Sequence, residues 1–110
     1  FKKINDTLGH LYGDYLLKEV ANIIKNSIRQ NDSAIRWGGD EFLVILRKAD
    51  YDDALKVVER IKMHIDNSTN GKIKISYGIE TSSEDITSPY ELISRADFKM
   101  YKYKYERGER

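Results

Sequence analysis

Two adjacent carboxylates beside a pair of glycines are the residues of this sequence whose types and spacing could do chemistry. The stretch reads Gly38-Gly39-Asp40-Glu41-Phe42. Glycine leaves the backbone bare, so a ligand could approach closely, and hard divalent ions prefer carboxylate oxygens. Asp40 and Glu41 would therefore concentrate negative charge where phosphates and a divalent ion could meet. The alternative is a hairpin turn with two incidental solvated acids, and the pentapeptide by itself favours that alternative.

Two short runs of strand-forming residues flank these carboxylates. Residues 34–37 precede them and residues 42–46 follow. Gly38-Gly39 predicts a two-residue hairpin turn, because glycine tolerates the positive φ angles that such a turn demands. Residues 42–46 are apolar without alternation, which predicts a strand covered on both faces.

Three further segments show the apolar period of amphipathic helices. Asp14 stands directly before the first and is placed to cap it. The second runs over about 50–67 and begins with acidic residues. The third has Ser88 as its cap, Pro89 at its first position and Glu91 three residues after the cap. The apolar stripes of the three helices comprise Leu16, Leu17, Val20, Ala21, Ile24 and Ile28; Ala54, Val58, Ile61 and Ile65; and Leu92, Ile93, Ala96, Met100 and Tyr103.

The order of the elements predicts the fold class. Apolar and polar residues alternate over 73–77, which predicts another strand that continues towards Ile79. Residues 1–8 could make a turn or two of helix, and Gly9 and Gly13 predict a loop after it. This mixed order with an antiparallel hairpin predicts an α+β sandwich of ferredoxin-like type, with a mostly antiparallel sheet flanked by helices.

Length and composition limit the possible functions. A chain of 110 residues can bury one modest core, which predicts a single domain. Its 19 basic and 18 acidic residues give a net charge of +1, which excludes a disordered tail and a uniformly basic nucleic-acid binder. Without cysteine it has no disulfide framework and no thiolate zinc site, which agrees with a cytoplasmic location. No apolar run has transmembrane length, so we expect no direct membrane contact from this domain. The opening residues Phe1-Lys2-Lys3 are typical of the middle of a longer chain.

Three separated patterns together resemble the GGDEF domain, the diguanylate cyclase module. Residues 1–14 resemble F-K-x-I-N-D-x-x-G-H-x-x-G-D, and residues 38–42 match the family signature letter for letter. Residues 75–79, with Arg95-Ala96-Asp97 and Met100-Tyr101, resemble the family's later strand and final helix. The resemblance covers the whole chain and implies a sandwich of the nucleotidyl-cyclase palm type.

The resemblance implies an enzyme that joins two GTP molecules into cyclic di-GMP and releases two pyrophosphates. Such a reaction depends mainly on positioning and on neutralising phosphate charge, which carboxylate-bound Mg²⁺ (or Mn²⁺) would do. It implies that Asp40 is a metal ligand and that Glu41 assists at the metal and phosphate site. Neighbouring strand residues face opposite ways, so we expect different roles for the two acids. The backbone of Gly38 and Gly39 would lie close to the nucleotide.

The resemblance also assigns residues to the rest of the nucleotide. Asn5 and Asp14 would read the guanine edge, since an amide and a carboxylate match its donors and acceptors. For Asp14 the residues alone favour a helix cap, and both roles can hold if the helix start forms the floor of the pocket. Lys2 would contact phosphate, with Lys104 as a second candidate, although each lysine alone would more often be simply solvated.

A second, inhibitory site follows from the resemblance. Arg29-Gln30-Asn31-Asp32 is separated from Gly38 by five residues, which is the spacing of the family's R-x-x-D motif. Product cyclic di-GMP would bind there, with Arg29 and Asp32 matched to guanine. Arg60, which lies off the apolar stripe of its helix, would be the remote arginine of this site. The alternative is an ordinary surface pair at a helix end, which would be worth little.

The sequence departs from the family pattern at both ends. The family's first strand, which carries a D-x-D metal ligand, and the helix before it would precede Phe1. The closing G-R-N and last strand are not clear in residues 105–110, which leaves the terminal phosphate-binding arginine unassigned. We therefore expect 1–110 to be one domain without these elements, and the fragment alone to be inactive if nothing supplies the second metal ligand. The parent chain would be membrane-anchored or not according to its upstream region, through which a homodimer would form.

Three hypotheses remain open from the sequence. The first is an active diguanylate cyclase with product inhibition. The second is a catalytically inactive regulatory module that binds GTP or cyclic di-GMP. The third is a structural domain whose motifs are relics, and it predicts no binding of guanine nucleotides.

Overall fold

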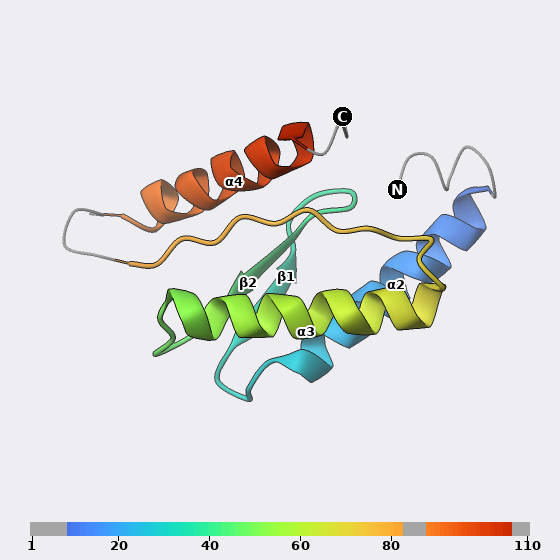
Figure 1. The fold of residues 1–110 in the computed structure, drawn as a ribbon, viewed down its shortest axis with the longest axis horizontal. Coiled ribbons are helices and arrows are strands. Elements are labelled where there is room, and N and C mark those ends of the chain that lie inside the picture. Colours follow the sequence, from blue (N-terminus) through green and yellow to red (C-terminus); the bar gives the residue numbers. More distant parts are fainter. Residues whose placement is uncertain (1–8, 83–87, 107–110) are drawn as a thin grey trace. The chain divides into compact units, whose positions relative to one another are not determined.

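The computed structural model describes residues 9–82 and 88–106 (Figure 1). The elements in chain order are α2 (His10–Ser27), β1 (Ser33–Arg36), β2 (Phe42–Ile45), α3 (Tyr51–Thr69) and α4 (Pro89–Glu106). Helices combined with an antiparallel strand pair confirm the predicted α+β class.

The described residues form two compact units. The first comprises residues 9–48 and Glu59–Lys74, and the second comprises Ala49–Val58, 75–82 and 88–106. The buried apolar residues of the first unit are Leu16, Leu17, Val20, Ile24, Ile61, Ile65 and Ile73. Those of the second unit are Ala54 and Ile79. The core of the first unit therefore comes chiefly from α2 and the later part of α3, as their apolar stripes predicted.

The hairpin forms as predicted, but its turn does not. Ser33 pairs with Ile45 and Arg36 pairs with Phe42, so five residues, 37–41, connect the strands. Neither glycine of this loop has a positive φ. The Glu41 carbonyl accepts the Trp37 amide at 2.8 Å and the Gly38 amide at 3.3 Å. The prediction of a two-residue turn is therefore wrong, because the bonds to this one carbonyl close a wider loop.

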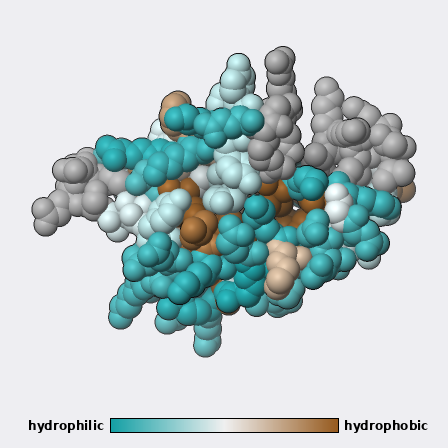
Figure 2. All heavy atoms as spheres, viewed as in Figure 1, coloured by the Kyte–Doolittle hydropathy of each residue, from teal (hydrophilic) through white to brown (hydrophobic). Residues whose placement is uncertain are grey.

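Strand β2 is also less buried than predicted, since its two faces are not both covered by other elements. Residues 42–44 are half-buried, and Ile45 is 46% exposed. An apolar run indicates which residues prefer burial, but the packing partners that would bury them lie far away in sequence. On the face of the molecule drawn in Figure 2, hydrophilic residues predominate and hydrophobic residues reach the surface only in small areas.

Helix α2 starts five residues earlier than the sequence indicates. It begins at His10, so Asp14 lies within its second turn and is not its cap. Gly9, with a φ of 90°, occupies the cap position, and its carbonyl accepts the Gly13 amide at 3.2 Å. The predicted loop through Gly13 is wrong. A glycine inside a helix costs about 1 kcal/mol relative to alanine, and burial of the apolar face of α2 offsets that cost.

Helix α3 starts where predicted and ends two residues later. The Asp53 amide donates to the Asp50 carboxylate at 2.8 Å, and the Asp50 amide donates back to Asp53 at 3.2 Å. This reciprocal pair is a capping box built from two aspartates. At the other end Gly71, with a φ of 74°, donates its amide to the Asp66 carbonyl at 3.0 Å. Such a left-handed glycine is a usual helix stop.

Helix α4 begins as the sequence predicts. The Ser88 hydroxyl accepts the Glu91 amide at 3.2 Å, and Pro89 is the first helical residue. The apolar side of this helix is only half-buried, and none of its residues is fully buried. Its main aromatic contact joins Tyr103 to Tyr77, with ring centroids 4.8 Å apart.

The prediction of a strand over 73–79 is wrong. Residues 72–82 are neither helix nor strand and run as a long trace in Figure 1. Ile73 and Ile79 are nevertheless buried, as their alternation indicates. Alternation reports which side chains prefer burial, whereas a strand also needs a neighbouring strand for its ladder of backbone hydrogen bonds.

Candidate functional site

The loop 37–41 presents the carboxylate of Asp40 to solvent. Asp40 is exposed, and within the described structure its carboxylate takes part in no hydrogen bond or ion pair. Glu41 is half-buried, and its carboxylate lies on the Gly38 side of the loop. Both acids precede the first residue of β2, so the argument from alternating strand faces does not apply to them. Their different exposure still separates an acid that is free to bind a ligand from one that lies against the loop.

The glycines of this loop are not required by the packing of the described residues. A Cβ on Gly39 would meet no atom within 4 Å, and one on Gly38 would lie 3.6 Å from Glu41, an ordinary contact. Neither backbone has a positive φ. The fold therefore leaves open space at this pair, as a site for a close ligand requires.

The residues of the loop fit a magnesium ion in part. Mg²⁺ is usually held by one or two carboxylates together with substrate phosphates and water. Asp40 supplies one such carboxylate, with Glu41 next to it. No group of three or more potential ligands occurs in residues 9–82 and 88–106. The donor set thus fits an ion that a nucleotide helps to hold, and does not fit a site made of protein ligands alone.

An open cleft of about 800 Å³ lies in the first unit between α2 and the hairpin. Asp14 and Leu17 line it from α2, and Arg36 and Phe42 line it from the strands. The cleft has the size of sites that hold drug-sized ligands or cofactors. It places Asp14 on the wall of a cavity that the hairpin also lines, although these residues are far apart in sequence. The full lining is Asp14, Leu17, Lys18, Ala21, Asn22, Ile24, Lys25, Ile28, Arg29, Gln30, Asp32, Ala34, Arg36 and Phe42.

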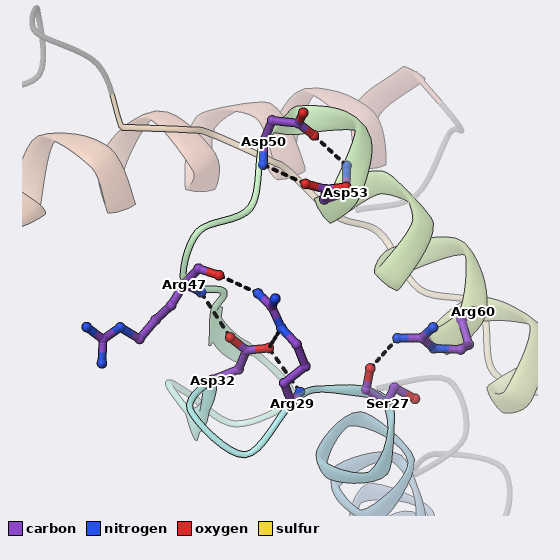
Figure 3. Close-up of polar contacts among 7 residues, drawn as sticks. All are labelled: Ser27, Arg29, Asp32, Arg47, Asp50, Asp53 and Arg60. Atoms are coloured by element: carbon purple, nitrogen blue, oxygen red, sulfur yellow. Dashed lines mark hydrogen bonds and ion pairs between the residues drawn. The ribbon is translucent and has the colours of Figure 1, made fainter.

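Arg29 and Asp32 form an ion pair that also reaches the end of the hairpin (Figure 3). The Arg29 Nε lies 3.3 Å from an Asp32 oxygen, which also accepts the Arg29 amide at 3.0 Å. The other Asp32 oxygen accepts the Arg47 amide at 2.9 Å, and the Arg29 guanidinium donates to the Arg47 carbonyl. The Asp32 side chain is 2% exposed and that of Arg29 is 64% exposed. Asp32 therefore ties the chain after α2 to the chain after β2, while Arg29 stays accessible.

Arg60 reaches the end of α2 from α3. Its Nη2 donates to the Ser27 carbonyl at 2.5 Å, which satisfies one of the last carbonyls of that helix (Figure 3). Ser27 is two residues before Arg29 in sequence. The three residues of the predicted inhibitory site are thus in one unit, with two of them joined directly and the third held at the helix end beside them.

The hydrogen bonds to Asp32 hold the pKa of its carboxyl below the ordinary value of 3.8. The Arg47 amide is the largest cause, and the Arg29 contacts add to it, while burial acts in the opposite direction. A lowered folded-state pKa means that the stabilisation is complete above the unfolded value and is lost as the pH falls through the folded value.

This sign gives a prediction for acid unfolding. We expect Asp32→Asn to lower the free energy of unfolding at pH 7 and to have a smaller effect below the ordinary pKa of 3.8, where the wild-type carboxyl also becomes protonated. Urea unfolding of both proteins at pH 7 and at acid pH measures this difference. An equal difference at the two pH values would contradict it.

The other predicted site residues belong to the second unit or lie outside the described residues. Lys2 and Asn5 lie outside the described residues. Lys104 is half-buried in the last turn of α4 and belongs to the second unit, whereas Asp40 belongs to the first. The structure thus brings Asp14 to a common cleft with the base of the hairpin and leaves the three other assignments as predictions.

Arg36 is the site residue that the sequence reasoning missed. Its guanidinium contacts the carbonyls of both loop glycines, at 3.3 Å for Gly38 and at 3.0 and 2.5 Å for Gly39. The sequence shows an arginine at the end of a strand directly before the loop, and that position was the available signal.

None of the helices in the described part of the chain is both long enough and apolar enough to cross a membrane.

Comparisons with known proteins identify the family of this chain. The profile of the family described as "Diguanylate cyclase, GGDEF domain" matches residues 1–110. Diguanylate cyclase A of Treponema denticola is 40% identical in an alignment of 110 positions, which covers 94% of this chain and 30% of that protein. The response regulator PleD of Caulobacter vibrioides is 38% identical in an alignment of 112 positions, which covers 94% of this chain and 25% of that protein. The chain thus spans between a quarter and a third of the length of these relatives.

Solved structures give the same result. An EAL/GGDEF domain protein from M. capsulatus superposes with a TM-score of 0.77 at 33% identity, over 96% of this chain and 72% of that chain. A GGDEF domain of a Pseudomonas aeruginosa protein called TpbB or YfiN superposes with a TM-score of 0.74 at 28% identity, over 96% of this chain and 65% of that chain. Because the family profile matches residues 1–110, this chain belongs to the GGDEF family.

Proposed function

We propose that this domain is a diguanylate cyclase, which condenses two GTP molecules into cyclic di-GMP and releases two pyrophosphates. In each half of the reaction the 3′-hydroxyl oxygen of one GTP bonds to the α-phosphorus of the other. The bond from that phosphorus to the bridging oxygen breaks, pyrophosphate leaves, and the hydroxyl proton is lost. The single observation that supports this function is the exposed Asp40 carboxylate, free of protein partners within the described structure, on a loop whose glycines leave open space.

The residues would divide the work as follows. Asp40, assisted by Glu41, would hold Mg²⁺ or Mn²⁺, which neutralises phosphate charge. Asp14 would accept hydrogen bonds from the guanine ring NH and amino group, and its place on the wall of the cleft supports this role. Gly38 and Gly39 would let the phosphates approach the backbone. Asn5, Lys2 and Lys104 complete the proposed nucleotide contacts.

The proposed assembly is a homodimer, formed through the upstream region, in which two domains face each other with one GTP each. We propose that the domain works in the cytoplasm and that 1–110 is one domain without the family's first strand, the helix before it and the last strand. The second metal ligand would then come from the preceding strand.

The experiment is to incubate the full-length protein with GTP and Mg²⁺ and to measure cyclic di-GMP and pyrophosphate. We expect one cyclic di-GMP for every two pyrophosphates, and no product from ATP. Tight guanine-nucleotide binding without product would instead favour the inactive regulatory module. The partial set of metal ligands in the described residues is the observation that keeps this alternative open. Absence of both binding and product would favour a structural domain.

The proposed function includes product inhibition at Arg29, Asp32 and Arg60. We expect Arg29→Ala to raise the inhibition constant of cyclic di-GMP about 10- to 100-fold, because it removes a guanidinium that can bind a guanine edge in a bidentate way. Inhibition curves normalised to each variant's own uninhibited rate provide the measurement.

Asn31→Ala is the matched control for that variant, since Asn31 is exposed in the same turn and does not line the cleft. We expect its inhibition constant to stay at the wild-type value. An unchanged constant in Arg29→Ala would contradict the inhibitory assignment.

A further inference from the structure

Arg36 connects the hairpin to the loop that carries Asp40. It is the last residue of β1 and stands opposite Phe42, the first residue of β2. Its Nε lies 3.0 Å from the Gly39 carbonyl oxygen and 3.3 Å from the Gly38 carbonyl oxygen, and its Nη2 lies 2.5 Å from the Gly39 oxygen. Two nitrogens of one rigid guanidinium plane therefore hold a single carbonyl.

The bonds to the Gly39 carbonyl also fix the orientation of the peptide plane between Gly39 and Asp40. The peptide bond between them is trans and planar, so the Asp40 amide points opposite to the Gly39 oxygen. The orientation of this plane sets the direction in which the chain leaves towards the Asp40 side chain. On the other side of the loop, the Trp37 and Gly38 amides are held by the Glu41 carbonyl. Arg36 is thus the side chain that restrains the middle of a loop whose ends are restrained by the backbone.

These contacts contribute little to the stability of the fold. Arg36, Gly38 and Gly39 are all exposed, and exposed polar contacts of a long flexible side chain are worth little because water competes for them. Glycine loops have many accessible backbone conformations, so a restraint on the loop acts mainly on its order. An effect of Arg36 should therefore be seen in the reaction rate before it is seen in unfolding.

We propose that Arg36 is a positioning residue, which holds the Gly38-Gly39 backbone so that Asp40 points to the place where the metal and phosphates bind. This inference rests on the proposed function. In this role Arg36 does not contact the nucleotide. The planar shape of its guanidinium group, and not only its positive charge, fixes the direction of Asp40.

The test compares Arg36→Ala and Arg36→Lys in the full-length protein, with Arg95→Ala as control. Arg95 is an arginine in an exposed ion pair with Glu91 on α4, and it has no role in the proposed reaction. We expect Arg36→Ala to lower kcat about 10- to 100-fold, the loss typical of a misplaced reacting group, with a much smaller change in KM for GTP. Arg36→Lys should recover little, since one ammonium cannot hold the carbonyl with two coplanar donors. Guanidinium ion at concentrations far below denaturation should restore part of the activity of Arg36→Ala and none in Arg36→Lys.

Hydrogen exchange of the amides in residues 37–42 gives a measurement that does not depend on activity. We expect faster exchange there in Arg36→Ala than in Arg95→Ala, with equal unfolding midpoints. A wild-type protein that makes no cyclic di-GMP would overturn the proposed function, and the exchange measurement would still decide whether Arg36 orders the loop. Unchanged kcat, a loss confined to KM, or equal exchange in the two variants would each overturn the role of Arg36.

Discussion

Asp40→Ala is expected to lower the synthesis of cyclic di-GMP about 100- to 1,000-fold, the loss seen when one preorganised electrostatic group is removed from an active site. Asp40 is exposed on the loop, and its carboxylate makes no hydrogen bond or ion pair with the described residues. It is therefore free to bind a metal ion beside the phosphates. The removal of an exposed carboxylate without partners should leave the free energy of unfolding nearly unchanged. Initial rates at saturating GTP, measured over a range of Mg²⁺ concentrations, check this prediction.

Asp52→Ala is the matched control for Asp40→Ala. Asp52 is an exposed aspartate in the first turn of α3, and its charge acts there mainly on the helix dipole. We expect its rate to stay close to that of the wild type. If Asp40→Ala retained a rate similar to that of Asp52→Ala, Asp40 would not be the metal ligand.

Gly78→Ala is expected to destabilise the second unit strongly. A Cβ at this position would collide with the Ala96 carbonyl oxygen and would lie 2.5 Å from the Met100 nitrogen and 2.9 Å from the Lys99 Cβ. Most of these atoms are helix backbone, which cannot move aside as a flexible side chain can. Overpacking of this kind costs about 1–3 kcal/mol, and more when the backbone itself must shift. Thermal or urea unfolding measures the loss, which should appear together with weaker contact between residues 75–82 and α4.

Gly39→Ala provides the contrast to Gly78→Ala. A Cβ on Gly39 meets nothing within 4 Å and the residue has no positive φ, so the free energy of unfolding should hardly change. If the glycine pair serves a close ligand, the same variant should lose activity. A large loss of stability in Gly39→Ala, or none in Gly78→Ala, would contradict this assignment of the two glycines.

The helix boundaries show which parts of the fold can be predicted from sequence. The starts of α3 and α4 depend on contacts between Asp50 and Asp53 and between Ser88 and Glu91, each spanning three residues. Such contacts can be predicted from the local sequence, and the predicted starts of α3 and α4 are both confirmed. Helix α2 differs, because it begins at His10 after Gly9, whose carbonyl accepts the Gly13 amide, and no side chain caps its start. The predicted cap at Asp14 was wrong, since Asp14 lies inside the helix.

The candidate site divides in the same way. The glycine pair and the two acids of the signature can be read from residues 38–42, and so can the pairing of Arg29 with Asp32, which are three residues apart. The contact between Asp32 and Arg47 spans fifteen residues and the contact between Arg60 and Ser27 spans thirty-three. Neither has a local signal, because each depends on how whole elements pack.

The sequence by itself determined the α+β class, the caps of α3 and α4, the hairpin and the resemblance to the GGDEF family, because these rest on residue types at short, fixed spacings. Only the tertiary structure decided that Asp14 lines a cleft, that the loop has five residues and that Arg36 holds its glycines. It also decided that residues 72–82 form no strand and that Gly78 must be bare against α4. These features depend on distances between segments that are far apart in the chain, and periodicity along the chain carries no information about such distances.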